Sequence, residues 1–354
     1  MHRRPSTCFR HRPGAAPRAV LIALALLLVL GLAGWKLLRP KRAALVVYCA
    51  HDLEFSEPVL KAFEERTGIP VVIVPDTEAS KSLGLVQRLL AEKDQPRCDV
   101  FWNNEQLGTM ELAEAGVLEA HQGEGWSRMP AEHRDPKGLW TGFAARMRVW
   151  IVNTQAMPPT IEAVGAAADA ENLSRVAIAR PLYGTTRTHY TVLWHLWGGD
   201  TVQAWHEDLR RRGIIELPGN GPVKNHVAAG TCHLGLTDTD DFFAAIDERK
   251  PVAMVPVQLT NGKTIVIPNT VALIRGTPRG DDARKLVDFL LSAEVELMLA
   301  NSRSRQIPLG PVDEDRLSDE VKQLRKLAGD GYPLSNLAAA AKECLRWLQR
   351  EYVK

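Results

Sequence analysis

Acidic side chains that could bind a cation are concentrated in one short segment, Thr237-Asp238-Thr239-Asp240-Asp241, directly after an apolar run. Carboxylates held close together repel one another unless they share a cation or a hydrogen-bond donor. Asp240 and Asp241 are therefore predicted to contact a hard cation, which prefers oxygen ligands, or the ammonium group of a ligand. The segment is also typical of a loop that caps the next helix, because Asp is common at helix N-caps.

Two further polar residues, His51 and Glu105, follow short apolar runs at 44–50 and 99–102. If these runs are strands of one parallel sheet, both residues lie at strand carboxyl ends, where open α/β sheets bind ligands. A histidine in such a loop can instead cap backbone groups. A glutamate there can instead be an acid favoured by the dipole of the following helix.

A third candidate is the run Gly184-Thr185-Thr186-Arg187-Thr188, which precedes a helix predicted over 188–199. Hydroxyl groups, backbone amides and an arginine at the start of a helix form a natural site for an anion. We therefore predict that Thr185, Thr186 and Thr188 bind part of the ligand. Ordinary capping of the helix by threonine is the alternative.

Arg146 and Arg148 lie where the chain is predicted to cross between two α/β regions. Arg146 is predicted to reach the ligand, and a surface charge is the alternative for either arginine.

No motif of an enzyme accompanies these residues. The sequence has no GxGxxG, Walker, HExxH, GxSxG or CxxC pattern. A hydrolase or transferase would have to pair His51 or His189 with Asp240 or Asp241, and no nucleophile stands in a recognisable setting. We therefore expect no enzyme and no catalytic cofactor. A net charge of only +2, from 44 basic and 42 acidic side chains, argues against nucleic acid as a partner.

Helices and strands alternate along the chain in the order expected of α/β proteins. The early strands are apolar throughout, which predicts a parallel sheet covered by helices on both faces. The predicted strands lie at 44–50, 70–75, 99–102, 149–153, 176–179, 214–216, 233–237, 252–257 and 268–274. The predicted helices lie at 56–67, 80–93, 108–115, 188–199, 200–213, 280–291, 293–300 and 338–352.

The N-terminal segment has the character of an export signal. Five arginines precede an uncharged apolar run at 20–34, and apolar residues continue to Leu38. This pattern predicts export with the N-terminus left in the cytoplasm. The 19 residues from Val20 to Leu38 are just long enough to span a membrane, so we expect an uncleaved anchor, with signal cleavage and secretion as the alternative. The rest of the chain is then placed in the periplasm or on the extracytoplasmic face.

Seven segments in order give residues 44–310 a resemblance to a known family. They are VVYCAHDLEFSEPVLKAFEERTGIPV, AEKDQPRCDVFWNNE, GLWTGFAARMRVWIVNT, RVAIARPLYGTTRTH, AAGTCHLGLTDTDDF, IPNTVALIRG and SRQIPLG. The chain resembles the iron(III)-type, family-1 extracellular solute-binding proteins of bacterial ABC importers.

The resemblance implies a two-lobed α/β, periplasmic-binding-protein-like (type II) fold with a central cleft. The first lobe would be discontinuous, formed by 43–145 and 268–310, and the second would be 146–267. A basic tail and signal or anchor segment at 1–42 and a C-terminal helical extension at 311–354 complete the predicted organisation.

The resemblance also implies a metal site. In ferric members a histidine and a glutamate at places similar to His51 and Glu105 bind iron, together with a pair of tyrosines. Asp240 and Asp241 stand where that pair would fall, so His51, Glu105, Asp240 and Asp241 are the predicted metal ligands, with a small anion at the threonine run.

The expected function is therefore capture of iron(III) or another hard cation for an ABC transporter permease. A binding protein for a phosphorylated or phosphonate compound, or an anchored ligand sensor, is the alternative.

Overall fold

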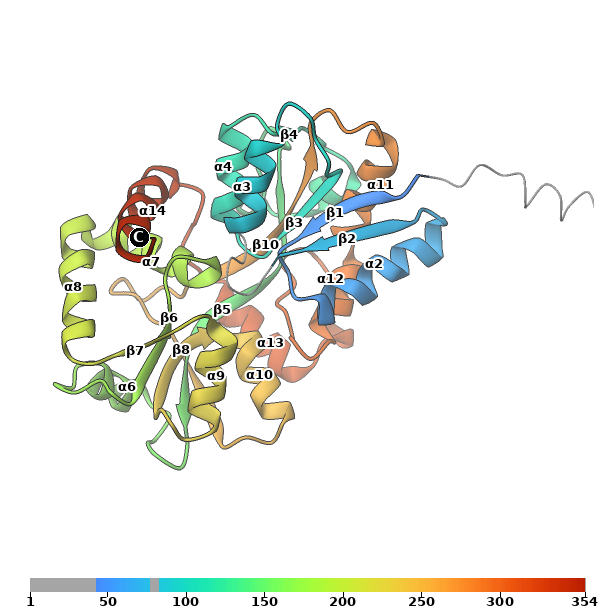
Figure 1. Ribbon diagram of the computed structural model, residues 1–354. Coiled ribbons are helices and arrows are strands. Elements are labelled where there is room, and N and C mark those ends of the chain that lie inside the picture. Colours follow the sequence, from blue (N-terminus) through green and yellow to red (C-terminus); the bar gives the residue numbers. More distant parts are fainter. Residues whose placement is uncertain (1–42, 77–82, 354) are drawn as a thin grey trace, which may run out of the picture. The chain divides into compact units, whose positions relative to one another are not determined.

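The computed structural model describes residues 43–76 and 83–353 of the chain, and residues 44–354 form one compact unit (Figure 1). The predicted tail and anchor segment at 1–42 lies outside the described residues. Within the described ranges, no helix has the length and apolar character needed to cross a membrane.

The first half of the sheet is parallel, as predicted. Its central strand β1 pairs in parallel with β2 on one side and β3 on the other. Each strand leads into a helix, which is the arrangement expected when apolar strands are covered on both faces. The elements are β1 (Leu45–Cys49), α2 (Leu53–Thr67), β2 (Val71–Pro75), α3 (Leu83–Ala91), β3 (Val100–Asn103), α4 (Gln106–Glu114), β4 (Leu118–Glu119) and α5 (Glu124–Arg128).

Two long antiparallel strands, β5 (Thr141–Asn153) and β10 (Val266–Ile274), continue the sheet. The first half of β5 pairs with β10, and its second half pairs with β8 and β9. The sequence indicated only the end of β5, because its first half contains small and charged residues. The predicted lobe boundaries at 145/146 and 267/268 fall inside these two strands and remain a prediction.

The second half of the sheet has the same βα alternation as the first. Strand β6 lies between β7 and β8 and is parallel to both. The elements are α6 (Ile161–Ala168), β6 (Val176–Ala179), α7 (Gly184–Trp197), α8 (Gly199–Arg211), β7 (Ile215–Leu217), α9 (Asn220–Ala228), β8 (Leu234–Asp238), α10 (Thr239–Asp247) and β9 (Val252–Pro256).

Four C-terminal helices complete the fold, namely α11 (Gly280–Leu290), α12 (Ala293–Ala300), α13 (Asp319–Ala328) and α14 (Ala338–Tyr352). Helix α14 packs against α7 and also contacts α4 (Figure 1). Its Trp347 lies against Tyr190 and His206, and the hydroxyl group of Tyr352 is 2.9 Å from Nε2 of His206. The C-terminal extension is therefore an integral part of the folded core.

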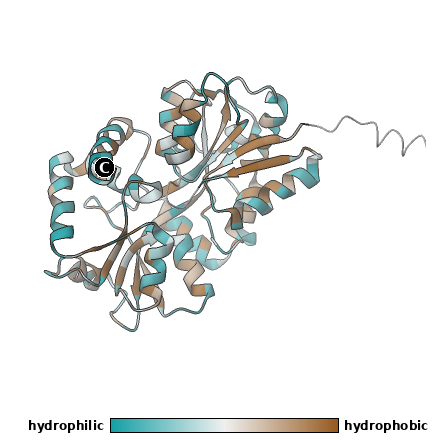
Figure 2. Cartoon of the chain, viewed as in Figure 1, coloured by the Kyte–Doolittle hydropathy of each residue, from teal (hydrophilic) through white to brown (hydrophobic). Residues whose placement is uncertain are grey.

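Hydrophobic residues are concentrated on the strands and on one face of most helices (Figure 2). The cysteines among the described residues, Cys49, Cys98, Cys232 and Cys344, are all buried, and the last three are free thiols. Burial raises the pKa of the Cys344 thiol to about 12, so this side chain behaves as a small core residue.

Candidate functional site

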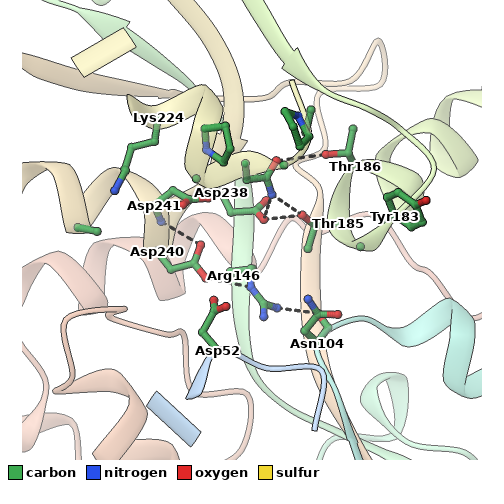
Figure 3. A pocket seen from close by; sticks show the side chains of 18 of the residues that line it. Asp52, Asn104, Arg146, Tyr183, Thr185, Thr186, Lys224, Asp238, Asp240 and Asp241 are labelled. Atoms are coloured by element: carbon green, nitrogen blue, oxygen red, sulfur yellow. Dashed lines mark hydrogen bonds and ion pairs between the residues drawn. The ribbon is translucent and has the colours of Figure 1, made fainter. Parts of the chain in front are cut away.

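A cavity of about 480 Å³ lies where three helices of the second half of the sheet begin (Figure 3). Strands β6, β7 and β8 end at the same edge and lead into α7, α9 and α10, because parallel strands place their carboxyl ends together. The loop before α2 contributes Asp52 to the opposite side, so residues from both halves of the sheet line the cavity.

Three carboxylates meet in this cavity. Asp238 ends β8, and Asp240 and Asp241 lie in the first turn of α10. One oxygen from each of them lies within 4.8 Å of the others. Such a cluster of hard oxygen donors is the kind of site that hard cations prefer.

Two buried arginines balance part of this negative charge. Nη1 of the fully buried Arg148 lies 2.7 Å from Oδ1 of Asp238, and Nε of Arg146 lies 3.2 Å from Oδ2 of Asp240. Arg146 also donates to the backbone oxygen of Asn104, 2.8 Å away (Figure 3). The structure therefore brings the predicted residue Arg146 together with Asp240, and Arg146 links the two halves of the sheet.

Asp241 is the carboxyl group without an arginine in this cluster. Its Oδ2 atom accepts a hydrogen bond from the hydroxyl group of Thr237, 2.8 Å away. Burial raises the pKa of Asp241 well above its usual range, and the charges of Asp240 and Asp238 raise it further. Burial and the neighbouring charges therefore favour the protonated form of Asp241, whereas a bound cation would favour the ionised carboxylate.

Only two of the three predicted threonines line the cavity, because the three lie at different positions around α7. Thr185 and Thr186 line the cavity, and Thr185 donates a hydrogen bond to Asp238. Thr188 points elsewhere and lies 3.3 Å from Glu105. Gly184 at the start of α7 also lines the cavity, and a helix N-terminus favours an anion. Arg180 and Lys224 add positive charge to the lining, and Lys224 lies on the side of Asp241 (Figure 3).

Glu105 lies outside the cavity lining and is fully buried. As the N-cap residue of α4, it accepts hydrogen bonds from the amides of Leu107 and Gly108, at 2.6 and 2.8 Å. Its carboxylate also lies 3.0 Å from Nη2 of Arg187 in α7. This placement corresponds to the alternative for Glu105, an acid favoured at the start of the following helix.

His51 is also buried and outside the cavity lining. Its Nδ1 accepts a hydrogen bond from the amide of Asp52, 2.7 Å away, and its Nε2 lies 2.6 Å from the side-chain amide of Gln306. The structure thus brings Asp240 and Asp241 together but places His51 and Glu105 elsewhere.

Sequence reasoning missed Asp238 as part of the site, although it lies in the same acidic run. The strand was predicted to end at residue 237, whereas β8 continues through Asp238. It also missed Asp52, Tyr183 and Lys224, which line the cavity from separate loops and helices. No spacing in the sequence connects these three residues.

Comparisons with known proteins agree on one group. The family model described as "Bacterial extracellular solute-binding protein" matches residues 45–301. The Iron uptake protein A1 of Synechocystis sp. is 22% identical over 313 residues, which cover 83% of each chain.

Solved structures agree on the fold. Iron-bound HitA from Pseudomonas aeruginosa superimposes with a TM-score of 0.76 at 20% identity, covering 88% of this chain and 100% of that chain. AfuA from Actinobacillus pleuropneumoniae, with exogenous fructose-6-phosphate bound, superimposes with a TM-score of 0.72 at 20% identity, covering 87% and 98%. The predicted two-lobed α/β fold with a central cleft is therefore confirmed.

Proposed function

Because this chain belongs to the bacterial extracellular solute-binding proteins, we propose that it captures a hard cation, foremost iron(III), for an ABC importer. The family assignment made from the sequence is confirmed by the match over residues 45–301. The relatives named for iron support the choice of cation, and they include Iron uptake protein A1 and iron-bound HitA.

The carboxylate cluster is the observation that carries this proposal. Asp238, Asp240 and Asp241 offer several hard oxygen atoms within 4.8 Å, in the cleft where the fold binds ligands. In the proposed bound state, the cation would lie among the three carboxylates and favour the ionised form of Asp241. The lining also includes Asp52 and Glu54, so acidic side chains outnumber basic ones around the cavity.

A small anion would complete the metal's coordination shell from the side of α7. The start of α7 at Gly184, Thr185 and Thr186, with the positive charge of Arg180 also in the lining, is the natural place for it. His51 and Glu105 would join the metal only after a rearrangement that releases their present partners. We keep them as proposed ligands of a second, more closed conformation, which hinge motion between lobes could reach.

The protein would act as a receptor and not as an enzyme. A transporter permease would be its partner, and the apolar N-terminal segment would hold it at the extracytoplasmic face of the membrane.

An intact-mass measurement of the purified protein tests the anchor. The full-length mass is expected, and a mature N-terminus near residues 35–45 would replace anchoring by secretion.

Metal analysis of the protein purified without chelator tests the cation. We expect about one iron per chain in the wild type and negligible iron in Asp240→Asn/Asp241→Asn, because neutral amides are poor ligands for a trivalent ion. Asp281→Asn/Asp319→Asn is the matched control, since it removes the same charge from side chains that are 95% and 93% exposed. Negligible iron in every sample, with a phosphorylated or phosphonate compound bound to the wild type, would reject the cation and favour that ligand instead.

A further inference from the structure

A second cavity, of about 440 Å³, lies between α4, α14 and the start of α7. We call it the α4–α14 groove, and it shares no lining residue with the cleft. Its apolar surface comes from α4 on one side and α14 on the other, through Leu107, Met110, Ala338, Ala341 and Leu345. A volume of this size is in the range of small-molecule sites in proteins.

A buried guanidinium group lies at the base of the groove. Arg187 lines it, is 4% exposed, and donates from Nη2 to Glu105. In the described part of the chain, the other N–H groups of Arg187 have no protein acceptor. Because a guanidinium group has five N–H donors in a planar fork, this arrangement leaves donors for an anionic oxygen that enters the groove.

The rim of the groove also favours a negative head group. Arg346 makes no ion pair among the residues described here, and Lys342 is neutralised by Glu114 at 2.5 Å. Glu111, on the α4 side, is the remaining acid of the lining. Burial raises the pKa of Glu111, which weakens the negative charge that it presents to the groove, although the charge of Arg187 acts in the opposite direction.

We infer that the α4–α14 groove is a second ligand site, which binds a small amphipathic carboxylate with its head at Arg187 and its apolar body between α4 and α14. The inference does not depend on what the cleft binds, because the two cavities have separate linings. A ligand here would join α14 to α4 and so hold the C-terminal extension against the first half of the sheet.

Titration calorimetry with octanoate tests the inference on the full chain, with octylammonium and octanol as matched probes. We expect octanoate to bind and the other two to bind at least about tenfold more weakly, because each lacks the negative head group. The inference would be overturned if octylammonium or octanol bound with the same affinity as octanoate. It would also be overturned if octanoate did not bind.

Three variants locate the site. Ala341→Trp fills the groove and Arg346→Glu reverses its free charge, so each should weaken octanoate binding by about tenfold or more. Arg350→Glu is the control, since it makes the same change on an exposed position of α14 that does not line the groove. Asp240→Asn/Asp241→Asn should bind octanoate like the wild type. Unchanged binding in both groove variants, or loss of binding in the cleft variant, would place octanoate elsewhere and refute the assignment.

Discussion

The buried pair of Glu105 and Arg187 allows a structural role to be separated from a ligand role. At 3.0 Å and an effective dielectric constant of about 20, the attraction between the two charges is about 5 to 6 kcal/mol before desolvation is subtracted. Removing one partner leaves the other charged and buried, which costs about 3 kcal/mol or more. Glu105→Gln and Arg187→Met should each destabilise the protein by about this amount.

The double variant should cost much less than the sum of the single variants. Removing both charges leaves neither residue as a buried charge that has lost the other, so we expect a coupling energy of at least about 2 kcal/mol between the two sites. Urea unfolding followed by circular dichroism measures all three variants. The reasoning would be refuted if the losses of unfolding free energy in the two single variants simply added up to the loss in the double variant. It would also be refuted if each single variant lost less than about 1 kcal/mol.

Iron binding by the same double variant supplies the second readout. If Glu105 serves only to cap α4 and to pair with Arg187, Glu105→Gln/Arg187→Met retains the iron affinity of the wild type. If Glu105 moves to the metal in a closed conformation, the double variant loses iron affinity while its stability stays close to that of the wild type.

Three further outcomes are expected. Burial lowers the pKa of His189 to about 3, with a contribution from the charge of Arg148, so the folded state resists protonation of this side chain. The free energy of unfolding should therefore fall as the pH drops from about 6.5 toward 3, by up to about 1.4 kcal/mol per pH unit. Unfolding experiments on His189→Gln should show a flatter pH dependence. A Cβ at Gly108 would lie 2.8 Å from Glu105 Oε1 and from Val86 Cγ2, so Gly108→Ala should destabilise the protein by about 1 to 3 kcal/mol. A Cβ at Gly165 in α6 would have no atom within 4 Å, so Gly165→Ala should stabilise the protein slightly in the same assay. Arg146→Met should leave Asp240 without its arginine partner and should lower the melting temperature measured without ligand.

The parts of the fold that the sequence predicted well are those with a strong local pattern. Helix α14 begins and ends at the predicted residues 338 and 352, because its apolar positions repeat at helical spacing over four turns. Helix α9 was missed, and α10 was anticipated only as the helix that the acidic run would cap, without bounds. Each has only 9 residues, and glycine or aspartate residues near its start resemble a loop in the sequence.

The candidate site shows where local patterns stop being informative. The acidic run at the start of α10 was found because neighbouring carboxylates are conspicuous in any sequence. The direction in which Glu105 and His51 point depends on Arg187 and Gln306, which are far away in the sequence. Thr188 differs from Thr185 and Thr186 only by its position around α7, which turns it away from the cavity toward Glu105.

The most direct test of the account is diffraction at the iron absorption edge from crystals loaded with iron(III). We expect one anomalous peak bounded by the carboxylates of Asp238, Asp240 and Asp241, which is absent from crystals of Asp240→Asn/Asp241→Asn. A cleft that contains no iron after loading, or iron bound away from these three carboxylates, would contradict the central claim.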